Sequence, residues 1–467
     1  MALKIIVIGA GPGGYTAAAH AAGLGGEVTL VEGDRVGGVC LNRGCIPSKV
    51  MKTTADLLDR FRRAPEFGIR NPGVPSVDMP GLVRRKNKVV DIQAGGIMAL
   101  LKRRKVRYVQ GRAAVRPGRS IAVAREDGSE ILLEWDRLII ATGSRPRPLP
   151  FAPFDGKRVL SSDHVLDLDH VPESVAIIGG GVIGCEFAFI LSALGSRVTV
   201  VEELGRLLPL PAVEESCSDI LRREMKKRGI EVLVRHRAAA VAATDTGLAL
   251  TLGPAPGAES PSLPHREPLA VEMMLVCIGR GPWTGDLGLE ALGVARDQAG
   301  WVIADETMAT SAPGVYAIGD ILGPAKVMLA HAAAAEGVVA AENALGNNRR
   351  MRYDLIPTAI FTMPEVAAVG LTEARAAAEG RDVHVDRFLF RQVGKAHVIG
   401  DIAGEARLIS EKAGGRILGV HIIGAQAAEL IAEAVLALKT GCTVRELAET
   451  IHPHPTLAEI FMGTEGS

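Results

Sequence analysis

Two segments of the chain share one pattern, in which an apolar run leads through a glycine-rich turn and a helix to a second apolar run. In the first segment the apolar runs are residues 4–8 and 28–31, the glycine-rich turn is residues 9–14, and Glu32 follows the second run. In the second segment the apolar runs are residues 175–178 and 197–201, the glycine-rich turn is residues 179–184, and Glu202 follows the second run. Continuous apolar runs are typical of buried parallel strands, so each segment predicts a βαβ dinucleotide-binding unit. Two units predict two bound dinucleotides and electron transfer between them.

The spacing of the glycines assigns a role to each of them. Gly9 permits the tight turn, Gly11 lets a pyrophosphate approach the backbone, and Gly14 lets helix and strand pack closely. The corresponding glycines of the second segment are Gly179, Gly181 and Gly184. The alternative is a glycine-rich turn that binds no ligand.

An acidic residue ends the second apolar run of each segment. Glu32 and Glu202 are therefore each placed to accept hydrogen bonds from ribose hydroxyls. Glu203 adds a negative charge beside Glu202, and both carboxylates would repel a 2′-phosphate. The second cofactor is predicted to be NAD(H) and not NADP(H).

Other patterns predict the elements between and after these segments. Residues 82–105 form a long, basic, amphipathic helix in this prediction, and a turn signal at 126–129 joins strands 120–124 and 131–135 in a hairpin. Further strands are predicted at 138–143, 274–279 and 315–320, and a proline-rich surface loop at 253–268. After residue 349, strands are predicted at 359–361, 387–391 and 417–423, and a helix at 427–438. This last change of pattern indicates a separate α+β domain. The apolar stripe of its helix suits a core or a subunit contact and comprises Leu430, Ile431, Ala434, Val435 and Leu438.

Cys40 and Cys45 are separated by four residues. Gly44 and the extended-biased residue before Pro47 give the backbone freedom to bring the two sulfur atoms to bonding distance. A helix is predicted to start at Ile46, which places Cys45 at its positive end, where a thiolate is favoured. The apolar face expected for this helix comprises Val50, Leu57, Leu58 and Phe61. The pair suits disulfide exchange, and the alternatives are a stabilising disulfide, two buried thiols or a zinc site.

The C-terminal segment carries His452 and His454, each followed by a proline, and then Glu459. The prolines bias both histidines toward extended backbone and present the rings from a stiff segment. A histidine held by a carboxylate suits a general base for a thiol, because imidazole titrates near neutrality and the carboxylate fixes its tautomer. The alternative is a pair of loop histidines without a chemical role.

Composition narrows the classes of protein. The 467 residues are 48% hydrophobic, which predicts two or more domains, and 53 basic residues balance 53 acidic ones. This balance gives no reason to expect nucleic acid or an anionic membrane as a partner. The first residues show no signal-peptide pattern and no apolar run has transmembrane length, so we expect a cytoplasmic protein in which any disulfide is catalytic or transient. Four other cysteines are expected in the core and are Cys185, Cys217, Cys277 and Cys442.

The segment from Cys40 to Lys49, Cys-Leu-Asn-Arg-Gly-Cys-Ile-Pro-Ser-Lys, resembles the redox-active segment of the pyridine nucleotide-disulfide oxidoreductases. It is most similar to the members that oxidise dihydrolipoamide. The resemblance extends over the whole chain, because both glycine-rich segments, the cysteine pair, the Gly319-Asp320 pair and the terminal His/Glu segment occur in the family's order. It implies an α/β fold with two Rossmann-like domains, for FAD and NAD, and a C-terminal α+β dimerisation domain. The implied boundaries are 1–148 and 273–347 for the FAD-binding and central domain, 149–272 for the NAD-binding domain and 348–467 for the dimerisation domain.

The resemblance also implies roles for individual residues. Cys45 would contact the flavin and form a charge-transfer thiolate, and Cys40 would exchange with substrate. His454 would be the base and Glu459 its orienting acid, acting on the disulfide of the other subunit, which makes the active enzyme a homodimer. Lys49 would pair with Glu186 beside the flavin, where the alternative for Glu186 is a surface helix acid. Further cofactor-binding positions implied by the resemblance are Gly143, Gly279 and Asp320.

The expected reaction is oxidation of protein-bound dihydrolipoamide to lipoamide with NAD⁺ as acceptor. The expected partners are lipoyl-bearing domains of 2-oxo acid dehydrogenase or glycine cleavage complexes. Val39, Arg43 and Pro453 depart from the family's usual residues, so the alternative is an NADH-dependent reductase of another disulfide, a metal ion or a quinone. A hypothesis of another class is a docked structural component of a multienzyme complex, held through a basic patch that comprises Arg84, Arg85, Lys86, Lys88 and residues 102–105. The alternative for this patch is a solvated helix face.

Overall fold

The computed structural model describes residues 2–70, 73, 75–257, 268–285 and 287–464. The chain forms two compact units, each assembled from separate stretches of sequence. The first comprises Met1–Met51, Pro80–Arg147 and Gly279–Tyr353, and the second comprises Lys52–Met79, Pro148–Ile278 and Asp354–Ser467. The mixed α/β class predicted from the sequence is confirmed.

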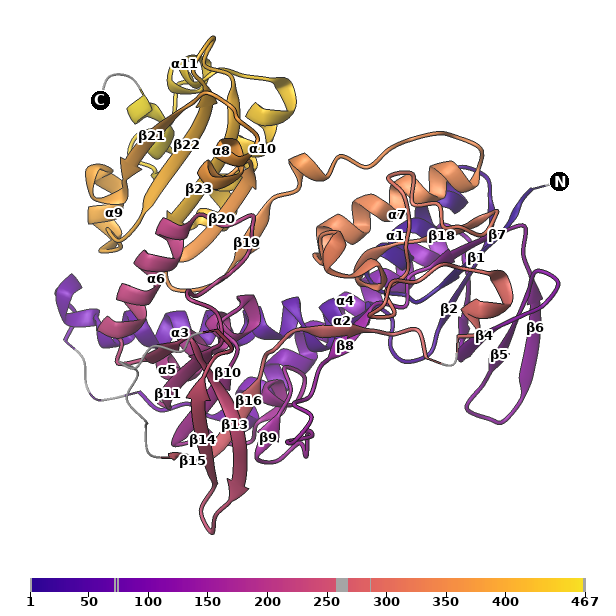
Figure 1. The fold of residues 1–467 in the computed structure, drawn as a ribbon, viewed down its shortest axis with the longest axis horizontal. Coiled ribbons are helices and arrows are strands. Elements are labelled where there is room, and N and C mark those ends of the chain that lie inside the picture. Colours follow the sequence, from indigo (N-terminus) through magenta and orange to yellow (C-terminus); the bar gives the residue numbers. More distant parts are fainter. Residues whose placement is uncertain (1, 71–72, 74, 258–267, 286, 465–467) are drawn as a thin grey trace. The chain divides into compact units, whose positions relative to one another are not determined.

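A five-stranded parallel sheet forms the centre of the first unit, with the strand order β18-β7-β1-β2-β3. These strands are β1 (Lys4–Ile8), β2 (Glu27–Glu32), β3 (Arg107–Gln110), β7 (Arg137–Ile140) and β18 (Val315–Ala317). Helices α1 (Pro12–Gly23) and α7 (Ala330–Ala344) pack side by side beside this sheet (Figure 1). The predicted first βαβ unit is therefore present, with α1 between β1 and β2 in the chain.

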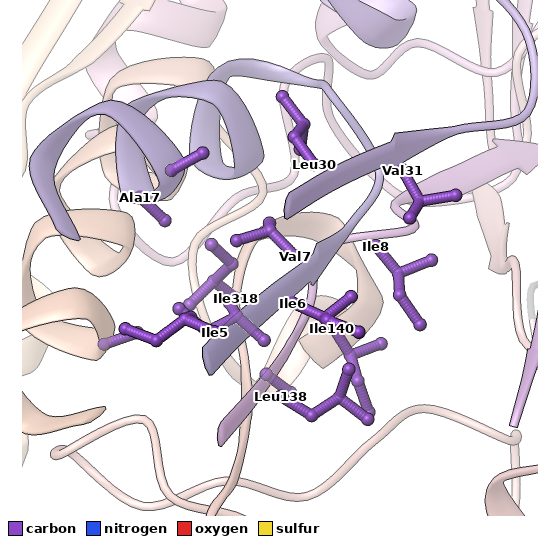
Figure 2. Packing of buried hydrophobic residues seen from close by; sticks show 14 of the residues in the cluster. Ile5, Ile6, Val7, Ile8, Ala17, Leu30, Val31, Leu138, Ile140 and Ile318 are labelled. Carbon is purple, nitrogen blue, oxygen red and sulfur yellow. The ribbon is translucent and has the colours of Figure 1, made fainter. Parts of the chain in front are cut away.

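Aliphatic side chains fill the space between this sheet and its helices, as Figure 2 shows. The whole of Ile5 to Ile8 on β1 is buried, because a central parallel strand is covered on both faces. Leu138 and Ile140 on β7 and Ala17 on α1 pack in the same cluster. Ile318 joins them from the chain directly after β18, which ties residue 318 to residues near the N-terminus.

Two smaller sheets belong to the first unit, and three helices lie wholly or partly in it. The antiparallel strands are β4 (Arg112–Arg116), β5 (Ser120–Ala124), β6 (Glu130–Glu134), β8 (Ser144–Pro146) and β17 (Arg280–Pro282). The hairpin predicted across residues 126–129 is confirmed, because β5 pairs with β6. The helices are α2 (Gly38–Arg43), α3 (Cys45–Arg62) and α4 (Met79–Arg103).

Two sequence predictions on these helices are wrong in part. On α3, Val50 and Leu58 are buried, but Leu57 is 62% exposed and Phe61 is 41% exposed. The buried face is set by the helical spacing of Met51 with Leu58, so Leu57 and Phe61 lie on another face. On α4, Lys86 is buried and lies outside any surface patch.

A second parallel sheet, in the second unit, has the strand order β12-β11-β10-β16-β9. Its strands are β9 (Val159–Leu160), β10 (Ser174–Ile178), β11 (Arg197–Glu202), β12 (Glu231–Val234) and β16 (Met273–Val276). Helix α5 (Val182–Leu194) connects β10 to β11, and α6 (Glu215–Lys227) precedes β12. A three-stranded antiparallel sheet is formed by β13 (His236–Ala243), β14 (Leu248–Pro254) and β15 (Leu269–Val271). The expected loop at 253–268 begins within β14, and its residues 258–267 lie outside the described residues.

The C-terminal part of the second unit is an antiparallel sheet with the order β19-β20-β23-β22-β21 and helices beside it. The strands are β19 (Thr358–Ile360), β20 (Glu365–Gly370), β21 (Val383–Leu389), β22 (Glu405–Glu411) and β23 (Ile417–Gly424). The helices are α8 (Glu373–Ala378), α9 (Gly394–Ile399), α10 (Ala427–Thr440) and α11 (Val444–Ala448). The predicted α+β pattern is confirmed. On α10, Ile431 and Ala434 are buried, and Leu430, Val435 and Leu438 pack at the edge of the same core.

Candidate active site

The two cysteines of the central motif lie on consecutive helices. Cys40 lies within α2, and Cys45 is the first residue of α3. Gly44 separates the helices with an extended φ of −143°, and the predicted helix start after the cysteine pair is close to the observed one. Helix α2 around Cys40 was not predicted from the sequence. A left-handed Gly37, with φ of 97°, starts this short helix.

The structure brings the two thiols into contact. A hydrogen bond with Cys45, together with burial, raises the pKa of the Cys40 thiol, and the charge of Lys49 acts in the opposite direction. Cys45 is exposed and lies at the N-terminus of an 18-residue helix, where the helix dipole favours a thiolate. Two sulfur atoms in contact can form a disulfide, which a thiolate can open through a mixed disulfide.

Polar groups around the cysteines hold the backbone of the motif. The Asn42 side-chain amide donates to the carbonyl of Gly38 at 2.9 Å and to that of Val36 at 3.1 Å. The Ser48 hydroxyl donates to the carbonyl of Cys45 at 3.2 Å, and Lys49 Nζ donates to Ser48 Oγ at 3.4 Å. The anchoring role of Asn42 was not predicted from the sequence.

The first glycine-rich turn has the geometry that a dinucleotide requires. Gly9 has a φ of 100°, and a methyl group there would lie 2.3 Å from the carbonyl oxygen of Ala141. A methyl group at Gly14 would lie 1.8 Å from the carbonyl oxygen of Gly9, so strand and helix meet at a distance that only glycine permits. At Gly11 the nearest described atom would be 4.0 Å away, at Gly38. The middle glycine therefore faces open space at the helix N-terminus, where a pyrophosphate fits.

Glu32 closes this turn from the end of β2. Its carboxylate accepts a hydrogen bond from the backbone N–H of Ala10 at 2.6 Å and another from that of Asp34 at 2.7 Å. Burial raises the pKa of Glu32, and these backbone hydrogen bonds act in the opposite direction. Each carboxylate oxygen has a second lone pair, so the group can still accept from a ribose hydroxyl.

The second glycine-rich turn repeats the same contacts in the second unit. Gly179 has a φ of 110°, a methyl group at Gly184 would lie 1.9 Å from the carbonyl oxygen of Gly179, and one at Gly181 would meet none of the described atoms within 4 Å. Glu202 is buried and accepts from the backbone N–H of Gly180 at 2.5 Å and of Leu204 at 2.7 Å. The residues of both turns thus fit a dinucleotide.

A glycine in close backbone contact and a glycine that faces open space should respond differently to substitution by alanine. We expect Gly184→Ala to destabilise the protein by about 3 kcal/mol or more, because its methyl group would overlap backbone atoms. We expect Gly181→Ala to leave the melting temperature unchanged and to weaken NAD⁺ binding, since the added methyl occupies the open space. Thermal unfolding and NAD⁺ titration check both variants. Equal melting temperatures for the two variants would contradict this assignment.

Gly143, Gly279 and Asp320 lie around the paired strands β8 and β17 in the first unit. Gly143 and Gly279 both adopt left-handed backbone, with φ of 74° and 104°. Asp320 accepts from the Ser144 hydroxyl at 2.6 Å, and Arg280 Nε donates to Ser144 Oγ at 2.6 Å. Ser144 and Arg280 were not singled out from the sequence, although each is adjacent to a predicted glycine.

Glu186 lies on α5 and is buried, which excludes the alternative of a surface helix acid. Its carboxylate accepts from the backbone N–H of Phe361 at 2.9 Å. Lys49 belongs to the first unit and Glu186 to the second. Their pairing beside a flavin stays a prediction.

The two histidines of the C-terminal segment have different surroundings. His454 is exposed, and its Nδ1 donates to Glu459 Oε1 at 2.8 Å, which leaves the lone pair of Nε2 for a proton. This hydrogen bond lowers the pKa of Glu459, so the carboxylate stays ionised. His452 is buried, and its two ring nitrogens face acceptors, the carbonyl of Thr450 and the carboxylate of Glu433, each at 2.8 Å. His454 is therefore the better placed of the two to accept a substrate's proton.

Two further properties concern metal binding and membrane insertion within the described residues. No group of three or more His, Cys, Asp or Glu side chains in that part of the chain is arranged to hold a metal ion. None of the helices within the described residues is long and apolar enough to cross a membrane.

Comparisons with known proteins place this geometry in context. The family model described as pyridine nucleotide-disulphide oxidoreductase matches residues 3–337, and the model of that family's dimerisation domain matches residues 356–464. A dihydrolipoyl dehydrogenase from Thermus scotoductus is 41% identical over 98% of this chain and 95% of its own length. One from Chlamydia pneumoniae is 38% identical, with the same coverage. The crystal structure of LpdA from Mycobacterium tuberculosis has a TM-score of 0.91 and 29% identity, and covers 99% of both chains.

Proposed function

Because the chain belongs to the pyridine nucleotide-disulphide oxidoreductase family, we propose that it is an FAD-dependent dihydrolipoyl dehydrogenase that uses NAD⁺. The single observation that carries this proposal is the attachment of the cysteine motif to the first dinucleotide turn. Gly37 N donates to the carbonyl of Ala10 at 2.8 Å, and a methyl group at Gly38 would lie 2.6 Å from Cα of Gly11. The helix that carries Cys40 thus begins against the turn that suits FAD.

The cysteines and His454 supply the thiol chemistry of the proposed reaction. With Cys40 and Cys45 joined as a disulfide, His454 takes a proton from one thiol of dihydrolipoamide, and the thiolate attacks the sulfur of Cys40. The bond between Cys40 and Cys45 breaks as the mixed disulfide forms, and Cys45 leaves as a thiolate at the N-terminus of α3. The second substrate thiol, once deprotonated, attacks the substrate sulfur that is bonded to Cys40. The bond to Cys40 breaks, Cys40 leaves as a thiolate, and lipoamide is released. The substrate has then lost two electrons and the cysteine pair has gained them.

The reduced cysteine pair must be returned to the disulfide after each turnover. When bound, FAD and NAD⁺ would supply the electron acceptors for this step. The residues that would hold FAD are Gly9, Gly11, Gly14, Glu32, Gly143 and Asp320, and those that would hold NAD⁺ are Gly179, Gly181, Gly184 and Glu202. The carboxylate of Glu202 opposes a 2′-phosphate, which supports NAD⁺ over NADP⁺.

The match to the family's dimerisation domain supports a homodimer. We propose that His454 of one subunit serves the cysteine pair of the other. We further propose that the substrate is carried by lipoyl-bearing domains of 2-oxo acid dehydrogenase or glycine cleavage complexes. The cytoplasmic location and the domain boundaries given above stay predictions, as does docking through Arg84 and Arg85.

Anaerobic steady-state turnover tests the proposed reaction. We expect NADH formation from NAD⁺ and dihydrolipoamide, at a kcat/KM at least about 100-fold above that with NADP⁺. The competing reactions are measured in parallel. Glutathione replaces dihydrolipoamide as the thiol substrate, and a quinone or mercuric ion is offered as the acceptor of electrons from NADH. Comparable rates with one of them, and none with dihydrolipoamide, would show that the chain is another kind of reductase of this family.

A further inference from the structure

Glu336 is a fully buried acid on α7 that the proposed reaction does not use. Its side chain has a relative exposure of 0%, and burial raises the pKa of its carboxyl group. Its helix is otherwise rich in alanine and valine. A carboxyl group in such surroundings costs free energy unless it is hydrogen-bonded, so its partners indicate what it holds.

The partners of Glu336 are a turn and a tyrosine. One carboxylate oxygen accepts from the backbone N–H of Gly319 at 2.6 Å, and the other accepts from the hydroxyl of Tyr353 at 2.8 Å. Gly319 follows β18 and adopts left-handed backbone, with a φ of 74°. Its neighbour is Asp320, which we assign to FAD. Glu336 therefore fixes the backbone of the turn that presents Asp320.

The same turn is held from its other side. The carboxylate of Asp320 accepts from the hydroxyl of Ser144, which in turn accepts from Arg280 Nε. Together these contacts fix both the backbone and the side chain of the Gly319-Asp320 pair. The side chain is fixed by residues of β8 and β17, and the backbone by α7.

Gly337, the residue after Glu336, allows α7 to pack closely against the first glycine-rich turn. A methyl group at Gly337 would lie 2.5 Å from the carbonyl oxygen of Gly13, and one at Gly13 would lie 3.0 Å from that of Ala333. The start of α1 and the middle of α7 are therefore in backbone contact. Residues 336 and 337 thus connect two parts of the chain, near positions 11 and 320, that would both bind FAD.

We propose that Glu336 is a positioning residue that sets the Gly319-Asp320 turn at the correct distance from the first glycine-rich turn and thereby determines FAD affinity. This inference rests on the proposed function, because it assigns FAD to the first dinucleotide unit. The positioning role requires a hydrogen-bond acceptor at the distance from the helix that a glutamate side chain reaches. An aspartate has the same charge but is too short to place its carboxylate there.

The test compares Glu336→Asp with Glu336→Gln. The first keeps the carboxylate and moves it back by one methylene, and the second keeps the length and one acceptor oxygen for Gly319 N–H. Glu342→Asp is the matched control, because Glu342 lies on the same helix and pairs with His20 and Arg349 instead. FAD dissociation constants are measured by adding FAD to the apoprotein and following the quenching of flavin fluorescence.

We expect E336D to bind FAD about tenfold more weakly than the wild type or worse, and E336Q and E342D to stay within about threefold. Tyr353→Phe provides a second test if E336D does not fold, because it releases one carboxylate oxygen and leaves Glu336 in place. Its expected loss of affinity is about five- to tenfold, which exceeds the variation allowed for the control.

Two results overturn the positioning role. The first is unchanged affinity in E336D, or in Y353F where E336D does not fold. The second is a loss in E336Q that equals or exceeds the loss in E336D, which would show that the reach of the side chain does not by itself set the affinity. Absence of FAD binding in the wild type would contradict the proposed function itself. This outcome is distinguishable from a failure of the positioning role, in which the wild type still binds FAD.

Discussion

Replacement of Cys40 with serine is expected to lower the turnover of dihydrolipoamide by on the order of a thousandfold or more, while FAD stays bound. A serine hydroxyl cannot form the disulfide that the substrate thiolate must attack, and Cys45 is then the one cysteine left in the motif. Cys45→Ser is expected to have a similar effect, because the first exchange step then lacks its leaving thiolate. Anaerobic turnover with NAD⁺ and the absorbance of bound flavin measure both quantities.

Cys442→Ser is the matched control for this experiment. Cys442 is half-buried, and its Sγ lies 3.1 Å from Thr440 Oγ1, so serine can make the same hydrogen bond. Its turnover should equal that of the wild type. If C40S keeps more than a tenth of the activity, the cysteine pair is not the working centre and the account of the reaction is wrong.

Replacement of His454 with glutamine is expected to lower kcat/KM for dihydrolipoamide by about 10²- to 10⁴-fold, the usual contribution of a general base. Glu459→Gln should cost less, about tenfold, because the imidazole remains and loses only the carboxylate that orients it. Since the hydrogen bond with His454 lowers the pKa of Glu459, this carboxylate should lose its function only as the pH falls below the usual range of a glutamate. Steady-state kinetics across pH for the three proteins measure these effects.

His452→Gln separates the two histidines of this segment. Both nitrogens of His452 already face acceptor oxygens, so its replacement should lower the melting temperature and change kcat/KM by less than about fivefold. A loss in H452Q as large as that in H454Q would contradict the assignment of the base. The experiment therefore distinguishes a base from a residue that holds the segment in place.

Those parts of the fold that depend on local pattern could be predicted from the sequence. The apolar runs and glycines of both βαβ units have fixed spacing, and each glycine has a steric reason that the structure makes visible at Gly14 and Gly184. The α+β character of the C-terminal part was also predictable, because strand-like runs are followed there by an apolar helix. The pairing of β18 with β7 joins residues far apart in the chain, and no local pattern specifies such a partner.

Features that depend on tertiary contacts were missed or wrong. Lys86 stands in a run of basic residues that predicts a solvated face, but the fold buries it. Leu57 and Phe61 are apolar yet exposed, since the face that α3 buries is set by what packs against it. Glu336 carried a usable signal, an acid between runs of alanine and valine, but its partners at positions 319 and 353 depend on the fold.

An anaerobic reductive titration tests the central claim, that the cysteine pair is a second redox centre beside the flavin. A disulfide and a flavin each accept two electrons, so we expect the wild type to consume two equivalents of a two-electron reductant per FAD. C40S should consume one. Consumption of a single equivalent by the wild type, unchanged by C40S, would contradict the account, because the flavin would then be the only redox centre.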